Sequence, residues 1–387
     1  MTLPLDGVRV IEIGQALAGP LAGVILADLG ADVVKVEKPD GGDDARAWGP
    51  PWGQSLGGDT SLYFHAQNRN KRSFALDLKA PADVAALQRL AEGADILIQN
   101  LRPGVVAELG IGPDAMLARH PRLIYCSIWA FGHVGPMRLD PGFDPLLQAY
   151  GAMMSLTGRA EDPPTFCGAS INDKATGMFC VIGALAALRQ RDRTGRGCLV
   201  DTSLFETAVH WVEGPLNGYL ATGNLPARHG TGGAVIVPYQ VFETADRPIC
   251  LAAGNDRLWA RCARVLGHPE WAGDSRFATG PQRVGHKAVL IPLVATALRG
   301  NIRAHWLTAL AAAGVPSGPV NDIAELAAAE QLRAVEILQD LPGGGPRVVG
   351  LPISFDRQRP RSARGAPRVG EHNVEILGAE VLGQGRA

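Results

Sequence analysis

The sequence of 387 residues predicts an α/β protein whose larger domain is built on a doubly wound parallel sheet. Short apolar strands alternate with helices over residues 8–128, which is typical of βαβ units. The hydrophobic content of 46% supports a large core, and the length implies more than one lobe. At residues 222–238 Gly and Pro become frequent, and a smaller α+β domain is expected to follow.

The first βαβ unit has the strongest pattern. Residues 8–13 (Val-Arg-Val-Ile-Glu-Ile) predict a strand, residues 20–29 a helix and residues 33–37 a second strand. The alternation continues with strands expected at 74–78, 96–98 and 123–128 and with helices at 81–92 and 104–109. In such sheets, ligands bind where the strands end, so the loops that follow the strands are the first candidates for a site.

The rest of the chain separates into loops, a long helix and a second lobe. Residues 130–170 are rich in Gly, Pro and Asp, with one helix expected at 144–153. Further predicted elements are helices at 176–191, 203–221, 256–265, 286–298 and 303–313, and strands at 241–244 and 249–253. The Pro-rich tail is expected to return to the first lobe. The predicted domains are therefore 1–221 (large), 222–325 (small) and 326–387 (return to the large domain).

Charge and cysteine usage exclude several classes of function. The net charge of -1 gives no overall field that would attract nucleic acid or an acidic membrane. The six cysteines are scattered without a CxxC pair, and no HExxH pattern occurs among the nine histidines, so no built-in metal site is expected. Asp6 and Arg9 precede any long apolar run. We therefore expect a cytoplasmic protein without membrane or nucleic-acid partners.

The loop between the first strand and the first helix is a candidate anion site. Gly14–Pro20 lies where backbone N–H groups and a helix N-terminus can receive phosphate. Its glycines do not have the GxGxxG spacing, and Pro20 also suits a first helical turn. Glu37, at the end of the second strand, lies where an NAD enzyme places its ribose-binding acid. An NAD-dependent oxidoreductase therefore stays as a disfavoured alternative.

Basic residues follow several of the predicted strand ends. Singly, each is an ordinary surface charge, but together they are able to form a cationic rim for phosphates. They are Lys38, Arg46, Arg69, Lys71, Arg72 and Arg102.

Asp173 has two competing interpretations. It lies in Gly-Ala-Ser-Ile-Asn-Asp-Lys, directly before the predicted apolar helix, where Asp is a common N-cap that the helix dipole keeps ionised. A carboxylate among small residues is also able to act as a covalent nucleophile. The pattern alone favours the cap.

Several long motifs, in this order, resemble the class III coenzyme A-transferases, the CaiB/BaiF family that includes formyl-CoA transferase, carnitine CoA-transferase and 2-methylacyl-CoA racemases. They cover nearly the whole chain, which makes the match specific. The motifs are PLDGVRVIEIGQALAGPLAGVILADLGADVVKVEKPDGGDDAR, NRNKRSFALDLK, QNLRPGVVAELGIG, PGFDPLLQAYGAMMSLTG, the Asp173 segment with LAALRQRDRTGRG, and GVPSGPVNDIAEL.

The resemblance implies an interlocked homodimer, in which each chain forms a Rossmann-like large domain from both of its ends and a small domain between them. It implies acyl-CoA and small carboxylic acids as substrates, without a tightly bound cofactor or a metal. Asp173 matches the nucleophile of the family. The implied CoA contacts are Gln15, Ala16 and Ala18 along the pantetheine and thioester, Lys38 and Lys71 near the adenosine phosphates, Arg102 near the pyrophosphate or adenine, and Asn70 and Arg72 in the same basic run.

The resemblance also distinguishes transferase from racemase. Racemases of the family use a His directly before an Asp in the segment that matches Gly142-Phe143-Asp144, and Phe143 cannot move a proton. Gln148 also favours a transferase. His133 keeps racemisation open as an alternative, and a non-catalytic CoA-binding protein is another. Gly230-Thr231-Gly232-Gly233 matches a glycine-rich lid only in part.

The expected mechanism is covalent. Asp173 attacks the donor thioester to give a mixed anhydride, CoA returns to form an aspartyl-CoA thioester, and the acceptor acid then takes over the CoA. The backbone N–H groups of Gln15–Ala18 are expected to stabilise the carbonyl oxygen.

Overall fold

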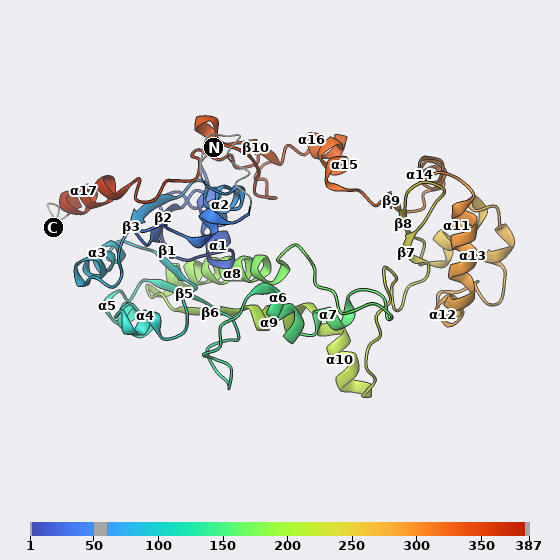
Figure 1. The fold of residues 1–387 in the computed structure, drawn as a ribbon, viewed down its shortest axis with the longest axis horizontal. Helices are drawn as coiled ribbons and strands as arrows, with labels where there is room; N and C mark the ends of the chain where they lie inside the picture. The colour runs from blue at the N-terminus through green and yellow to red at the C-terminus, as the bar shows by residue number, and fades with distance from the viewer. Residues whose placement is uncertain (1, 50–59, 384–387) are drawn as a thin grey trace. The chain divides into compact units, whose positions relative to one another are not determined.

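The computed structural model describes residues 2–49 and 60–383, which form two compact units (Figure 1). The first unit comprises Met1–Met153, Phe166–Asn217 and Gln331–Ala387, and the second comprises Met154–Thr165 and Gly218–Glu330. The sequence prediction placed 154–165 in the large domain. In the structure, this segment bonds to the second unit, because the N–H of Gly230 donates to the carbonyl of Gly158 at 2.9 Å.

The first unit is built on a parallel sheet of six strands in the order β3-β2-β1-β4-β5-β6. This order is that of a doubly wound fold, and the predicted α/β class is confirmed. The strands are β1 (Arg9–Ile13), β2 (Asp32–Glu37), β3 (Arg72–Ala75), β4 (Ile96–Gln99), β5 (Ile124–Trp129) and β6 (Leu199–Ser203). The sequence prediction missed β6.

Helices cover both faces of this sheet (Figure 1). Alternate strand residues point to opposite faces, so Val10 packs with α1 (Ala18–Asp28) and α8 (Ile171–Thr194), whereas Ile11 packs in a second core. The helices on that second face are α3 (Pro81–Ala91), α4 (Val105–Glu108) and α5 (Pro113–Arg119). The first unit also contains α2 (Leu62–Asn68), α6 (Asp144–Tyr150) and α9 (Leu204–Trp211). Most of α7 (Met153–Leu156) belongs to the second unit, and α10 (Glu213–Thr222) begins in the first unit and ends in the second.

Helix α8 is longer than predicted. It begins at Ile171 rather than near residue 176, so Asp173 lies inside its first turn. Among the described residues, it is the one helix long and apolar enough to cross a membrane by length and composition. It packs against α1, β5 and β6, so its apolar character is accounted for by the core of the first unit.

The C-terminal segment covers the edge of the sheet at β3. It contains α16 (Glu330–Ala334), the antiparallel pair β10 (Leu338–Asp340) and β11 (Arg347–Val349), and α17 (Asn373–Gly383). The Asn373 Oδ1 accepts from the N–H of Ala75 at 2.9 Å. An otherwise free strand edge is thereby blocked.

The second unit has an antiparallel sheet of three strands, β7 (Tyr239–Phe242), β8 (Ile249–Ala252) and β9 (Ser317–Pro319). Its core contains Trp259, Phe277 and Leu310. Its main helices are α11 (Asp256–Val265), α12 (Gly280–Gly285), α13 (Lys287–Arg299), α14 (Arg303–Ala312) and α15 (Ile323–Ala328).

Candidate active site

The loop that joins β1 to α1 lies at the carboxyl end of the sheet and is fixed by side chains from elsewhere. The side chain of Asn100, just after β4, bonds twice to the backbone of Gln15: its Oδ1 accepts from the Gln15 N–H at 2.8 Å, and its Nδ2 donates to the Gln15 carbonyl at 2.9 Å. The Asp43 Oδ1 accepts from the Ala16 N–H at 3.1 Å. The side chain of Gln15 is exposed.

These bonds change one sequence expectation. The N–H groups of Gln15 and Ala16 are already engaged, so they are not free to stabilise a thioester oxygen in this conformation. At the start of α1, the N–H groups of Leu17 and Ala18 have no acceptor among the residues that the structure describes. Of the backbone N–H groups of Gln15–Ala18 that were predicted to stabilise the thioester oxygen, those of Leu17 and Ala18 therefore remain candidates.

A buried cluster of charges lies beneath this loop. The Lys35 ammonium contacts the Glu12 carboxylate at 2.9 Å, the Asp43 carboxylate at 2.9 Å and the Gly14 carbonyl at 2.7 Å. The Lys71 ammonium contacts the other Glu12 oxygen at 2.6 Å and the carbonyl of Pro20 in α1 at 2.9 Å. Glu12 thus joins one lysine that holds the loop to another that holds the first turn of the helix.

Lys71 is therefore placed differently from its predicted role near the adenosine phosphates. Its side chain is 0% exposed, and a third bond joins its Nζ to the Asn68 Oδ1 at 2.8 Å. Burial lowers the pKa of Lys71 to about 8, and the Glu12 carboxylate opposes that shift. All three ammonium protons are used inside the protein. This placement does not support a phosphate contact.

Arg72 and Asn70 also have structural partners. Arg72 begins β3, at the amino end of the sheet, where its Nε donates to the Asp32 Oδ1 at 2.9 Å. The Asn70 amide bonds to Asp28 at 2.8 Å and, through its Oδ1, to the N–H of Ala363 at 2.8 Å. Ligands of parallel sheets bind at the opposite, carboxyl end. The positions of Arg72 and Asn70 therefore do not support CoA contacts.

Lys38 and Arg102 lie where a phosphate site is expected. They follow the carboxyl ends of β2 and β4, and both are exposed. The Lys38 ammonium pairs with Asp44 at 2.7 Å, and this hydrogen bond raises the pKa of Lys38. An exposed ion pair contributes little to stability, so an incoming phosphate is able to compete with Asp44 for the ammonium.

Glu37 is not available to a ribose. Its carboxylate receives the Arg46 guanidinium at 2.7 Å, the Ser73 hydroxyl at 2.8 Å and the Asp43 N–H at 3.0 Å. Burial opposes ionisation of Glu37, but Arg46 and Lys35 outweigh it and lower the pKa of Glu37. Because the Glu37 carboxylate already accepts these interior hydrogen bonds, it is not free to bind the ribose of NAD, and the NAD interpretation is not supported.

Asp173 is not the N-cap of α8. The N-cap residue, Ser170, has a φ of 47° and makes no side-chain cap bond. Instead, the Oδ1 of Asp144 accepts from the N–H groups of Asn172 at 2.7 Å and Asp173 at 3.1 Å. The carboxylate of Asp144, from α6, thus caps the N-terminus of α8, and the Asp173 side chain does not.

Gln148 holds Asp144 in place. Its Nε2 donates to the Asp144 Oδ2 at 2.6 Å, and its amide also bonds to both backbone groups of Cys167. Because the sequence separates Asp144 from Asp173 by a long loop region, the pattern gave no sign of this capping arrangement.

The protonation of Asp173 also differs from the sequence expectation. The helix dipole was expected to keep the carboxyl ionised. Instead, burial raises the pKa of Asp173 to about 7, and the negative charge of Asp144 is a second, smaller cause of this rise. A carboxylate with a raised pKa and little hydration is a stronger nucleophile once it loses its proton.

Asp173 lies one helical turn from the contact between α8 and the start of α1. Gly177, one helical turn further along α8, packs so closely on α1 that an added Cβ would lie 2.7 Å from the Ala18 carbonyl. Residues i and i+4 share one face of a helix, and their side chains lean toward the helix N-terminus. The Asp173 side chain therefore lies on the face of α8 that packs on α1.

The raised pKa of Asp173 predicts a pH-dependent effect on stability. Between about pH 4 and pH 7 the folded chain keeps a proton on Asp173 that the unfolded chain has lost, so stability falls as pH rises through this window. Asp173→Asn should not show this fall in stability with rising pH, because the asparagine amide is neutral at every pH in the window. We expect the variant to unfold at a higher temperature than wild type at pH 8, with the difference disappearing toward pH 4.

The measurement is thermal unfolding followed by circular dichroism from pH 4 to pH 8. Asp192→Asn is the matched control, because Asp192 is an exposed residue in the last turn of the same helix. A difference between Asp173→Asn and wild type that does not change with pH would contradict the raised pKa.

The two residues relevant to racemisation lie at the surface. Phe143 is 71% exposed and directly precedes α6. His133 is exposed, with its Nδ1 3.9 Å from the Asp201 Oδ2 of β6. Asp201 also accepts from the Trp129 indole at 2.7 Å. The described contacts of His133 are therefore with β6 rather than with Asp173 or Asp144.

The glycine segment of the second unit is held by its neighbours. The Thr231 hydroxyl accepts from the Val241 N–H at 3.2 Å, and the Gly233 N–H donates to the Tyr239 carbonyl at 3.0 Å. The match of this segment to a lid remains a prediction.

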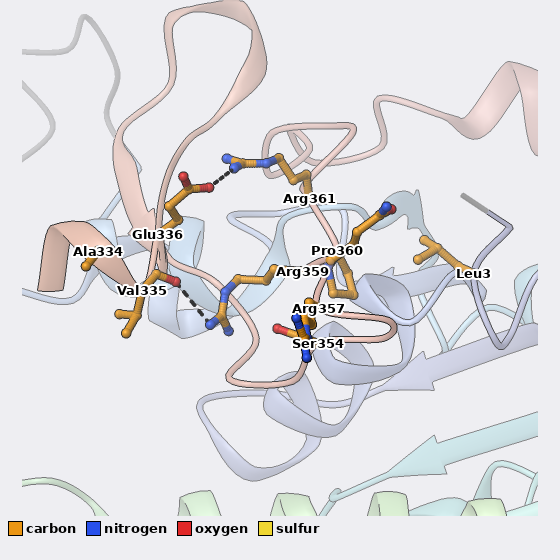
Figure 2. A pocket seen from close by; sticks show the side chains of 10 residues that line it. Leu3, Ala334, Val335, Glu336, Ser354, Arg357, Arg359, Pro360 and Arg361 are labelled. Atoms are coloured by element: carbon orange, nitrogen blue, oxygen red, sulfur yellow. Dashed lines mark hydrogen bonds and ion pairs between the residues drawn. The ribbon is translucent and has the colours of Figure 1, made fainter. Parts of the chain in front are cut away.

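A pocket in another part of the first unit is distinct from these residues. Figure 2 shows this pocket of about 710 Å³ in the first unit. Arg361 pairs there with Glu336 at 2.9 Å, and Arg359 donates to the Val335 carbonyl at 3.2 Å. Its lining residues are Leu3, Ala334, Val335, Glu336, Ser354, Arg357, Gln358, Arg359, Pro360 and Arg361. None of the sequence-predicted site residues is among them, so we do not assign it to the active site.

Comparisons with known proteins agree with the resemblance drawn from the motifs. A family model described as CoA-transferase family III matches residues 5–373. The succinate–glutarate CoA-transferase of Agrobacterium fabrum is 39% identical, over 97% of this chain and 95% of its own. The acetyl-CoA:oxalate CoA-transferase of Acetobacter aceti is 37% identical, over 96% of this chain and 95% of its own. A crystal structure of a CaiB/BaiF family protein from Brucella suis superposes with a TM-score of 0.88 at 37% identity, covering 98% of this chain and 100% of that one.

Proposed function

The chain belongs to CoA-transferase family III, and we propose that it moves CoA from an acyl-CoA donor to a free carboxylic acid through covalent intermediates on Asp173. The observation that carries this proposal is the position of Asp173. Asp144 caps α8 in its place, the Asp173 carboxyl is partly buried with a raised pKa, and it lies on the face of α8 that packs on the start of α1. A binding protein needs no such carboxylate, so these features favour the enzyme over a non-catalytic CoA binder.

In the proposed reaction the Asp173 carboxylate attacks the thioester carbonyl of the donor. The C–S bond breaks, CoA leaves as a thiolate, and Asp173 carries the acyl group as a mixed anhydride. The thiolate then attacks the Asp173 carbonyl, which releases the donor acid and leaves an aspartyl-CoA thioester. The acceptor carboxylate attacks this thioester, and the thiolate returns to the acceptor carbonyl, which frees Asp173 and completes the transfer.

We propose a CoA position that uses only part of the predicted contact set. Gln15, Ala16 and Ala18 lie along the pantetheine and thioester, and Lys38 and Arg102 meet the phosphates. The exposure of both basic residues at the carboxyl end of the sheet supports this assignment. The interior ion pairs of Lys71 and the position of Arg72 argue for leaving both out.

We propose dicarboxylic acids as the substrate class, because the relatives named above act on succinate, glutarate and oxalate by name. The test is a mass-spectrometric screen of acyl-CoA donors against free acids, which begins with succinyl-CoA and glutarate. The same samples in deuterium oxide report exchange at the acyl α carbon without an acceptor. Exchange without transfer would favour the racemase alternative.

We also propose that two copies of this chain form the functional homodimer. Two apolar side chains one turn apart on α8, Met178 (48% exposed) and Ile182 (60% exposed), face outward, and Trp211 at the end of α9 is 46% exposed. A second copy that covers this surface would remove it from water. We propose an interlocked arrangement, as in the family.

The dimer proposal predicts the effect of one charged substitution. Ile182→Glu places a charge in the proposed interface, so we expect it to shift the species in solution from about twice the chain mass of 40.8 kDa toward a single chain. Light scattering coupled to gel filtration measures this mass. Val289→Glu, at an exposed position in the second unit, is the control. A wild-type protein that elutes as a single chain would contradict the proposal.

A further inference from the structure

The backbone of the β1–α1 loop depends on bonds from outside the loop. Ala16 has a φ of 65°, in the left-handed region that is unfavourable for a residue with a side chain. The Ala16 N–H donates to Asp43, and both backbone groups of the preceding Gln15 bond to Asn100. The loop therefore has a conformation that its own sequence does not favour and that two other segments impose.

Asp43 is itself held from below. Its Oδ1 accepts from the N–H groups of Ala16 and Ala45, and its Oδ2 lies 2.9 Å from the Lys35 ammonium. Lys35 in turn donates to the Gly14 carbonyl at 2.7 Å. The loop is thus held at three successive residues, Gly14, Gln15 and Ala16, by side chains that are outside it.

The start of α1, directly after this loop, packs on α8 one turn from the proposed nucleophile, since an added Cβ at Gly177 would lie 2.7 Å from the Ala18 carbonyl. We infer that Asn100 and Asp43 are positioning residues of the transfer reaction, which hold the backbone of Gln15 and Ala16 where it orients the thioester for attack. This inference rests on the proposed function. Neither side chain needs to touch the substrate for this role, because each acts through the loop.

A positioning role predicts a particular kinetic pattern. Displacing a reacting group by about 1 Å costs about 100-fold in rate, whereas the adenosine end of CoA would keep its contacts. For Asn100→Ala we therefore expect kcat to fall about 100-fold with little change in KM for the acyl-CoA. Asn100 is only partly buried, so the unfolding temperature should change little.

Two further variants separate positioning from a general loss of structure. Asn100→Asp keeps an acceptor for the Gln15 N–H but loses the donor to the Gln15 carbonyl, so its kcat should lie between those of wild type and Asn100→Ala. Gln88→Ala is the matched control, because Gln88 is another partly buried amide that donates to a backbone carbonyl, that of Gly110, on the opposite face of the sheet. Its kcat should equal that of wild type.

The experiment combines steady-state kinetics with single-turnover formation of the enzyme–CoA adduct, followed by intact-protein mass spectrometry with succinyl-CoA. The inference predicts that wild type forms the adduct rapidly and Asn100→Ala slowly. Equal rates in both proteins, or a rise in KM at unchanged kcat, would overturn the inference and leave the proposed function standing. A wild-type protein that transfers CoA without ever forming an adduct would overturn both.

Discussion

Asp173→Ala is expected to lower the rate of CoA transfer by about 10⁴-fold or more, because removal of a covalent nucleophile removes the reaction path and not only one contact. The fold should persist. The N–H of residue 173 bonds to Asp144 through the backbone, and the Asp173 side chain caps nothing. Steady-state transfer from succinyl-CoA to glutarate measures the loss, and circular dichroism checks the fold.

Two controls make this result specific. Asp173→Asn keeps the size of the side chain but removes the charge, and we expect a comparable loss of transfer. Asp192→Ala removes an exposed carboxylate from the far end of the same helix and should leave transfer unchanged. Transfer by Asp173→Ala within tenfold of wild type would mean that another group carries the reaction.

Lys71→Met is expected to destabilise the protein by about 3–5 kcal/mol, because it leaves a buried carboxylate without one of its two partners. The side chains of Glu12 and Lys71 are both 0% exposed and 2.6 Å apart. An added Cβ at Gly23 of α1 would lie 1.9 Å from the same Glu12 carboxylate, so this carboxylate is closely packed against α1. Chemical denaturation measures the free energy of unfolding.

Lys38→Met is the matched control for this prediction. Lys38 is an exposed lysine at the carboxyl end of the sheet, so its loss should raise KM for acyl-CoA and leave the free energy of unfolding nearly unchanged. The two lysines should therefore have opposite effects. A Lys71→Met variant that is as stable as wild type but has a raised KM would contradict the structural role of Lys71. It would support the phosphate contact that the sequence motifs implied.

Local pattern was sufficient for five of the six strands of the parallel sheet and for several of its helices, but not for β6, α2 or α5. The βαβ opening has a clear alternation of apolar strands and helices, and β1, α1 and β2 begin and end within two residues of the predicted bounds or overlap them closely. The family motifs were confirmed across residues 5–373. What the pattern did not provide was the start of α8, because the group that caps it, Asp144, comes from a different helix.

The difference between the predicted and observed surroundings of Lys71 has a physical cause. A lysine in a polar run such as Asn-Arg-Asn-Lys-Arg is expected to be exposed. Only the pairing of β1 with β2, and of β2 with β3, reveals that Glu12 and Lys35 lie beneath Lys71. Glu12 and Lys35 lie in β1 and β2, which were predicted as strands without any role for these two charged residues. Charged residues at inward positions of two neighbouring strands are the one signal that could have suggested an internal ion pair.

The raised pKa of Asp173 has the same origin. The helix dipole, a local effect, favours ionisation, whereas burial and the neighbouring Asp144 carboxylate are tertiary effects that oppose it. Tertiary effects are larger here, and the sequence contained no information on either distance or burial.

The most direct test of the account is to trap the CoA thioester on the protein. Wild-type enzyme is mixed with succinyl-CoA, treated with hydroxylamine, which converts an aspartyl thioester to a hydroxamate, and digested for peptide mass spectrometry. The account predicts a hydroxamate at Asp173 that requires succinyl-CoA and is absent from Asp173→Asn. A hydroxamate at another carboxylate, or active transfer with no trapped residue at all, would contradict it.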